Sequence, residues 1–165
     1  MIGRRTGQGA RAGLATAPGA EVRRTLGFLL QDSARLIRRR FIARAREADL
    51  PLNHSETSVL QHVAHDQGVT QAKLAAQLDI EPITLVRLLD RLEELGLIER
   101  RSHPNDRRSW TIWLTKVARP MLDRIEVIRL AVRAEALDGF SRAEQEALTD
   151  ALVRLRANLA SKTEV

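Results

Sequence analysis

The sequence contains no cysteine and no tyrosine, and only 3% of its 165 residues are aromatic. The lack of cysteine excludes a disulfide framework, a zinc site built on thiolates and a cysteine redox sensor. The apolar residues make up 44% of the chain and are therefore mainly leucine, isoleucine, valine and alanine. Such residues favour a core of packed helices over a β-sandwich or a β-barrel.

The sequence also lacks an apolar run of the length that a membrane helix or a secretory signal needs. Residues 1–20 are rich in Gly, Ala and Arg, and we interpret them as a disordered basic tail. We expect residues 21–165 to form a single unit, because the chain is too short for two large domains. A cytoplasmic protein without a membrane partner is the corresponding prediction.

Motifs that carry catalysis are missing as well. The chain has no glycine-rich phosphate loop, no nucleophile elbow and no metalloprotease helix. Of its four histidines, only His62 and His65 have a ligand-like spacing, and no cysteine or acidic cluster accompanies them. We therefore predict a protein that is not an enzyme and that has neither a cofactor nor a metal site.

Positive charge is what the chain does have. Lysine and arginine number 27 against 21 for aspartate and glutamate, which gives a net charge of +6. A basic balance of this kind is typical of proteins that bind phosphate-rich polymers. An anionic membrane surface or an acidic protein would attract the same charge, so a basic helical interaction module is an alternative.

Apolar periodicity and capping residues predict four helices in the first part of the chain. Residues 22–48 form one long amphipathic helix, and Asn53 with Glu56 resembles a reciprocal cap that starts a second helix. Thr70 can cap a short third helix. The fourth helix has Pro82 in its first turn and ends at Gly96. Two short helices joined by a tight turn result.

The rest of the chain predicts a hairpin and two more helices. Residues 97–101 and 110–114 have the composition of strands, and the polar segment 102–109 joins them. Helical periodicity returns after residue 115 and is interrupted at Gly139, where Ser141 and Glu144 form a capping box. The expected fold is mainly α with a small β-wing, a winged helix-turn-helix.

The second helix of such a pair enters the DNA major groove. Its leucines (Leu85, Leu88, Leu89, Leu92 and Leu95) form one face, which leaves Thr84, Arg87 and Arg91 on another. Arginine can donate two parallel hydrogen bonds to a guanine or a phosphate. The alternative is an ordinary solvated face, on which Asp90, Glu93 and Glu94 complete local ion pairs.

The hairpin is rich in arginine. Its basic residues are Arg100, Arg101, Arg107 and Arg108, and we expect four guanidinium groups near a loop that reaches the minor groove or flanking phosphates. Asp106 lies among them, and we interpret its carboxylate as holding an arginine or the loop backbone in shape. The alternative is a charged loop tip without a partner.

The stretch VTQAKLAAQLDIEPITLVRLLDRLEELGLIERRSHPNDRRSWTIWLT, residues 69–115, resembles the winged-helix domain of the MarR family. The TLVRLLDRLEELGLI portion is especially similar to its SlyA branch. The resemblance implies a winged helix-turn-helix over residues 53–115. It also implies a homodimer built by helices in residues 22–48 and 116–161.

The same resemblance carries Arg87 over to the DNA-reading helix, and Asp106, Arg107 and Arg108 to the wing. The second wing strand departs from the pattern, because Trp110 and Trp113 stand where SlyA-like proteins usually have basic residues. Packing under the wing is one role for these tryptophans and contact with deoxyribose is the other.

The function that we expect is a sequence-specific regulator that binds double-stranded DNA at a pseudo-palindromic operator. The resemblance implies a repressor released by a small aromatic or carboxylate effector, with an activator or anti-silencer of the same fold as the alternative. Arg35 and Arg38 match arginines near the effector crevice of SlyA-like proteins and can hold a carboxylate. An arginine-rich helix flank is otherwise solvated or ion-paired.

Overall fold

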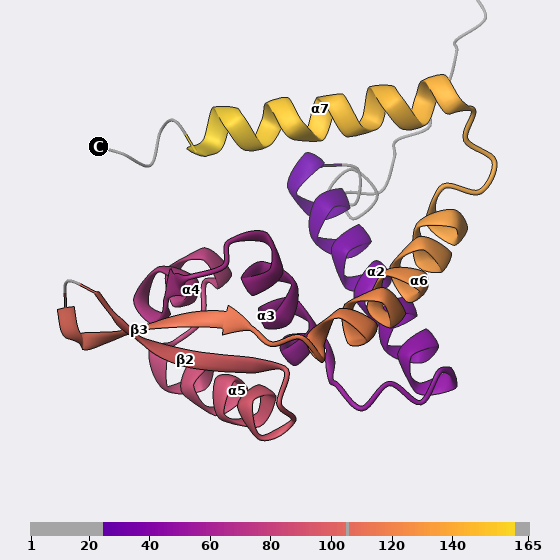
Figure 1. The fold of residues 1–165 in the computed structure, drawn as a ribbon. Coiled ribbons are helices and arrows are strands. Elements are labelled where there is room, and N and C mark those ends of the chain that lie inside the picture. The colour runs from indigo at the N-terminus through magenta and orange to yellow at the C-terminus, as the bar shows by residue number, and fades with distance from the viewer. Residues whose placement is uncertain (1–24, 105, 161–165) are drawn as a thin grey trace, which may run out of the picture. The chain divides into compact units, whose positions relative to one another are not determined.

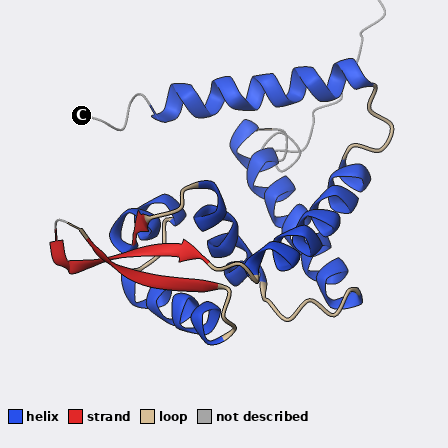
Figure 2. Ribbon diagram, in the orientation of Figure 1, coloured by secondary structure: helices blue, strands red, loops and turns tan. Residues whose placement is uncertain are grey.

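The computed structural model describes residues 25–104 and 106–160, without the side chains of residues 107 and 108 (Figure 1). The predicted basic tail, residues 1–20, lies outside the described residues. Figure 2 shows a mostly helical chain with one small sheet. The helices and strands are, in order, α2 (Leu26–Glu47), α3 (His54–His65), β1 (Val69–Thr70), α4 (Gln71–Leu78), α5 (Pro82–Glu94), β2 (Ile98–His103), β3 (Asp106–Leu114), α6 (Ala118–Ala136) and α7 (Arg142–Ala160).

The chain divides into two units at Leu36, within α2. The described part of the first unit, residues 25–36, is a helical segment with a largely exposed surface. Arg35 and Asp32 form an ion pair in it, with 2.5 Å between Nη2 and Oδ1. Its exposed large apolar side chains are Leu26, Phe28, Leu29, Leu30 and Leu36.

Within the second unit, the predicted cap at the start of α3 is confirmed. The Asn53 side chain accepts a hydrogen bond from the Glu56 amide at 3.0 Å, and the Glu56 carboxylate accepts one from the Asn53 amide at 2.7 Å. This reciprocal capping box satisfies two amides that the helix itself leaves unpaired. The start of α3 is therefore fixed by two side chains three residues apart.

The predicted capping of α4 and α5 is confirmed too. Thr70 Oγ1 accepts from the Lys73 amide at 3.3 Å, and Pro82 occupies the first turn of α5. Asp79, at φ +50°, makes the turn between the two helices, and Gly96, at φ +68°, follows the end of α5. A residue without a Cβ adopts the left-handed region at no steric cost, which is why glycine suits the second position.

The sheet has three antiparallel strands in the order β1-β3-β2, and both hairpin strands are longer than the sequence predicts. The segment predicted as loop, residues 102–109, is largely strand up to a tight connection around Pro104. Val69 is a strand residue that pairs with Ile112. A strand of two residues is too short to produce an alternating pattern, so its pairing is set by the sheet and not by local sequence.

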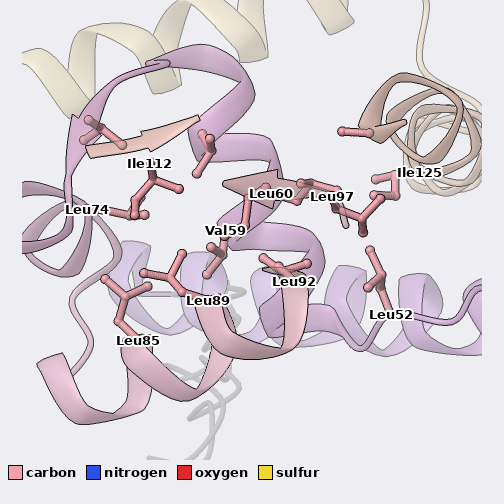
Figure 3. Packing of buried hydrophobic residues seen from close by; sticks show 14 of the residues in the cluster. Leu52, Val59, Leu60, Leu74, Leu85, Leu89, Leu92, Leu97, Ile112 and Ile125 are labelled. Carbon is pink, nitrogen blue, oxygen red and sulfur yellow. The ribbon is translucent and has the colours of Figure 1, made fainter. Parts of the chain in front are cut away.

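The core lies between α5, the sheet and helices α3 and α4 (Figure 3). Leu85, Leu89 and Leu92 of α5 are fully buried, as the apolar face of this helix predicts. Leu88 and Leu95 are only partly buried and pack at the edge of this core. The other fully buried large side chains include Leu60 of α3, Leu74 of α4 and Ile112 of β3.

Helices α6 and α7 differ in how far they contribute to this core. Ile125, Ile128 and Val132 of α6 are buried. Helix α7 buries none of its side chains, although the predicted capping box at Ser141 and Glu144 is present at its start. The Ser141 hydroxyl and amide donate hydrogen bonds that hold the pKa of the Glu144 carboxyl below its ordinary value. Helix α7 is thus well capped but has no fully buried side chain in the single chain.

Candidate nucleic-acid interface

Helix α5 presents a polar face opposite its buried leucines. Thr84 and Arg87 are both exposed, and both lie one residue from a position that faces the protein interior. Arg91 is exposed as well, but its guanidinium lies 3.4 Å from the Glu94 carboxylate and lines a pocket together with Arg46 and Glu56. The surroundings of Arg91 therefore differ from those of Thr84 and Arg87.

An exposed ion pair lies near the start of α4. Lys73 Nζ lies 2.8 Å from Asp66 Oδ2, just after α3. The hydrogen bond from Lys73 holds the pKa of the Asp66 carboxyl below its ordinary value. Because α4 packs on α3 and α5, this link helps to orient the helix pair.

The wing, which is the hairpin of β2 and β3, is tied to α5 by Arg100. Its guanidinium donates to Asp90 Oδ1 at 2.6 Å, to the Glu93 carboxylate and to the Val86 carbonyl at 3.5 Å. The Arg100 side chain is only 17% exposed. The expectation that four guanidinium groups lie near the wing loop is thus wrong for Arg100, because strand alternation turns this side chain toward the helix.

Arg101, the next residue, is turned to the other face of the sheet. It pairs with Glu99 and lies over the ring of Trp113, with 4.7 Å between Cζ and the ring centroid. Trp113 Nε1 donates to Thr111 Oγ1 at 3.0 Å, and the ring packs so closely on Gly68 that a Cβ there would lie 2.7 Å from it. Trp113 therefore anchors the wing on the loop before β1.

The tip of the wing carries the remaining predicted DNA contacts. Asp106 begins β3 and pairs in register with His103. It has an interaction partner, but its proposed role in holding an arginine or the loop backbone stays a prediction. Arg107 and Arg108 follow it in β3, and their side chains lie outside the described residues. Their contacts with DNA also stay a prediction.

A second pocket, of about 430 Å³, lies among α2, α3, α6 and α7. Arg38 lines it, as the prediction of a ligand-binding arginine requires, whereas Arg35 pairs with Asp32. Two further arginines, Arg129 and Arg133, line the same pocket, and sequence reasoning missed them. Their spacing of four residues on α6 places them on one side of a helix, which is the signal that was available. The apolar lining includes Ile37, Phe41, Val132, Leu148 and Leu152.

His54 lines both pockets and contacts the ring of Phe41 edge-on at 5.7 Å between centroids. Burial, and secondarily the charge of Arg38, lowers the pKa of the His54 imidazole. His62 Nδ1 lies 2.8 Å from the Ser58 carbonyl oxygen of its own helix. Among residues 25–104 and 106–160, no group of three or more His, Asp or Glu side chains is placed to hold a metal ion.

These elements define a winged helix-turn-helix: α4, the turn at Asp79, α5 and the two-stranded wing. The model of the MarR family matches residues 52–110. A crystal structure of MarR superposes with a TM-score of 0.77 at 23% identity, over 84% of this chain and 93% of that one. The chain therefore has the winged helix-turn-helix fold of MarR proteins.

Two structures that contain DNA are also similar. The transcriptional repressor CouR, bound to a 23-mer DNA duplex, has 27% identity and a TM-score of 0.71, over 82% of this chain and 95% of that one. A MarR variant from E. coli complexed with operator DNA has 21% identity and a TM-score of 0.70, over 85% of this chain and 99% of that one. None of the helices in the described part of this chain is both long and apolar enough to cross a membrane.

Proposed function

We propose that the chain is a DNA-binding transcriptional regulator of the MarR type and that α5 is its DNA-reading helix. The observation that carries the proposal is the division of α5 into a face with fully buried Leu85, Leu89 and Leu92 and a face with exposed Thr84 and Arg87. A helix seated in this way presents its polar face as a rigid surface. Similarity to CouR, a repressor whose structure contains a DNA duplex, supports the proposal.

In the proposed complex, α5 lies in the major groove and the wing contacts the neighbouring backbone. Arg87 and Thr84 contact base edges, and Arg107 and Arg108 contact phosphates. Arg91 has a smaller share than the sequence alone predicts, because it lies beside Glu94 and next to a pocket. Asp106 shapes the wing.

The regulator acts as a homodimer on a pseudo-palindromic operator. Helix α7 buries no side chain of its own, and its exposed apolar residues include Leu148, Leu152, Val153 and Leu159. The first turns of α2 expose a further set of leucines. Apolar surface of this extent on long helices is typical of faces that a second copy covers. Twofold symmetry of the protein then requires two related half-sites on the DNA.

The regulator is a repressor that an effector releases, and the 430 Å³ pocket is the effector site. Arginines Arg38, Arg129 and Arg133 line it together with apolar side chains, so it is suited to an apolar or aromatic body that carries a carboxylate. The pocket includes residues of α3, which contacts α5, and this contact gives a route from effector to DNA-reading helix. Membership of the SlyA branch stays a prediction.

The test is selection of duplexes of about 30 base pairs from a randomised library, followed by affinity titration of the enriched duplex. We expect an inverted repeat to be enriched, and we expect it to compete for the protein better than heparin or anionic vesicles do. Enrichment of no sequence, or stronger competition by vesicles, would contradict the proposal.

Substitutions then test the contacts. Arg87→Ala is expected to weaken binding by about 1–3 kcal/mol and to relax base preference at one position of each half-site. Arg108→Ala is expected to weaken binding to all sequences and to reduce the dependence on salt. Arg142→Ala, an exposed position on α7 that pairs with Glu146 of the same helix, is the control. Unchanged affinity for both wing and helix variants would refute the assignments.

A further inference from the structure

The two tryptophans of the wing have different surroundings. Trp113 packs on Gly68, donates a hydrogen bond to Thr111 and lies under Arg101. Trp110 is 46% exposed. In the described part of β2 and β3, it is the one large apolar side chain that is exposed. The packing role therefore belongs to Trp113, whereas nearly half of the Trp110 side chain is open to solvent.

The strand register shows which face of the wing carries Trp110. Arg100 pairs with Ile112, and Ser102 pairs with Trp110, so these residues share one face of the hairpin. That face is turned toward α5, because the Arg100 guanidinium contacts the Val86 carbonyl and Asp90. Trp110 thus lies on the α5 side of the wing, two residues beyond Arg100 in the direction of the tip.

Helix α5 also exposes an apolar side chain, Ile83, on the side that faces the wing. Val86 and Asp90 lie along the stripe of α5 that contacts Arg100, and Ile83 is three residues before Val86 on the same stripe. Ile83 is 64% exposed. Ile83 and Trp110 are therefore two exposed apolar side chains. They lie on the sides of α5 and of the wing that meet at Arg100.

The arginines at the base of the wing are already paired. Arg100 is held by Asp90 and Glu93, and Arg101 by Glu99. Contact with phosphates falls to the positions of Arg107 and Arg108 on the same strand as Trp110. A DNA strand attracted by those two cations carries deoxyribose rings next to its phosphates, and these rings are the apolar part of the backbone.

We propose that Trp110 is a DNA-contacting residue whose indole packs on deoxyribose of the strand that passes between α5 and the wing. The inference rests on the proposed function and adds a contact that is not ionic. An indole has a large apolar surface and one donor, so it suits a sugar with a phosphate beside it. Because this contact releases no counterions, it adds affinity without adding salt dependence.

The experiment uses the full chain and the duplex that it enriches from the randomised library. Affinities are titrated from about 50 to 200 mM salt for wild type, Trp110→Ala, Trp110→Phe and Arg108→Ala. We expect Trp110→Ala to bind about 5- to 50-fold more weakly at every salt concentration, with an unchanged salt slope, a loss within the range for removing an aromatic side chain that stacks on a base. Trp110→Phe is expected to recover most of the affinity, whereas Arg108→Ala lowers the slope.

A second measurement locates the indole directly. The wild-type chain is labelled with fluorotryptophan, which gives two fluorine NMR signals, and the Trp110→Phe variant assigns them. On addition of the duplex we expect the Trp110 signal to lose its solvent isotope shift, while the partly buried Trp113 changes little. Because the duplex is added to the wild-type chain, the only substitution that this measurement needs is the conservative Trp110→Phe, for the assignment.

The outcomes separate the inference from its basis. A protein that enriches no duplex overturns the proposed function and this inference with it. A duplex that is enriched, but that Trp110→Ala binds within about twofold of wild type while Trp110 keeps its solvent shift, overturns this inference alone. A changed salt slope in Trp110→Ala also overturns it, because the residue would then act through the neighbouring arginines.

Discussion

The leucines of the winged helix and those of helix α7 differ in burial. In α5, Leu85, Leu89 and Leu92 are fully buried by the same chain. In α7, Leu148, Leu152 and Leu159 are exposed, and no side chain of the helix is buried. The leucines of α5 are covered by other elements of the same chain, whereas none of the side chains of α7 is fully buried.

The comparison indicates which part of the chain is complete by itself. Burial of a leucine contributes about 1.5–3 kcal/mol, so the winged helix obtains its stability from contacts within one chain. Helix α7 has no fully buried side chain and obtains less from burial until something covers its apolar side. Substitutions in the first region should therefore change unfolding of the single chain, and those in the second should change association.

The largest effect is expected from Leu89→Ala in the core. Removing a fully buried leucine side chain costs about 2–5 kcal/mol, because transfer free energy is lost and a cavity remains. Urea unfolding followed by circular dichroism measures this cost. Ile83→Ala, on the same helix but exposed, is the matched control and is expected to stay within about 0.5 kcal/mol of wild type. Similar losses for both variants would show that burial does not distinguish these positions.

The next effect concerns the link between the wing and α5. Arg100→Ala leaves the Asp90 and Glu93 carboxylates close together without their shared cation. We expect a loss of about 1.5–3 kcal/mol in unfolding free energy, as for hydrogen bonds to charged groups. Arg101→Ala removes the exposed pair with Glu99 and is expected to cost less, about 0–1 kcal/mol. An equal cost for the two variants would contradict the assigned role of Arg100.

A smaller effect on unfolding, but a clear one on assembly, is expected from α7. The double variant Val153→Lys with Leu159→Lys places charges on its exposed apolar surface. If a second copy covers this surface, dimerisation should weaken by at least about tenfold, as sedimentation equilibrium measures, because buried unpaired charges are costly. Asp150→Lys on the same helix controls for added charge. Unchanged association of the double variant would remove α7 from the interface.

Features that depend on residues close in sequence could be predicted. The helix ends are defined by local hydrogen bonds or backbone preferences. The residues concerned are Asn53 with Glu56, Thr70, and Pro82 with Gly96. The buried face of α5 followed from its leucine spacing. These features gave the fold class and the exposure of Thr84 and Arg87.

Features that join distant segments could not. Strand β1 exists only because Val69 meets Ile112 across the sheet. Arg100 and Arg101 are adjacent in sequence, yet strand alternation sends one to Asp90 and the other to Trp113. The 430 Å³ pocket brings Arg38 of α2 together with Arg129 and Arg133 of α6. In each case the partner is chosen by tertiary structure, which the local pattern does not contain.

The last prediction concerns His54, where the long helix α2 meets the winged helix. Its lowered pKa, caused by burial and by Arg38, means that the folded state binds a proton less readily than the unfolded chain does. The neutral imidazole is therefore favoured on folding, and this contribution to stability is present above about pH 6.5 and is lost as the pH falls through the folded pKa.

His54→Gln removes this titration, so the variant is expected to lose less stability than wild type between about pH 7.5 and pH 5.5 in urea unfolding. His65→Gln, on the exposed end of α3, leaves the contact between His54 and Phe41 in place and is expected to keep the wild-type difference.

The same carboxylate effector that the arginine-lined pocket suits would favour the protonated imidazole of His54, because its negative charge offsets that of Arg38. Benzoate, used as a probe, should therefore bind wild type more tightly at the lower pH and bind His54→Gln with little pH dependence. If His54→Gln keeps the full pH dependence of stability, His54 is not the group whose protonation lowers that stability.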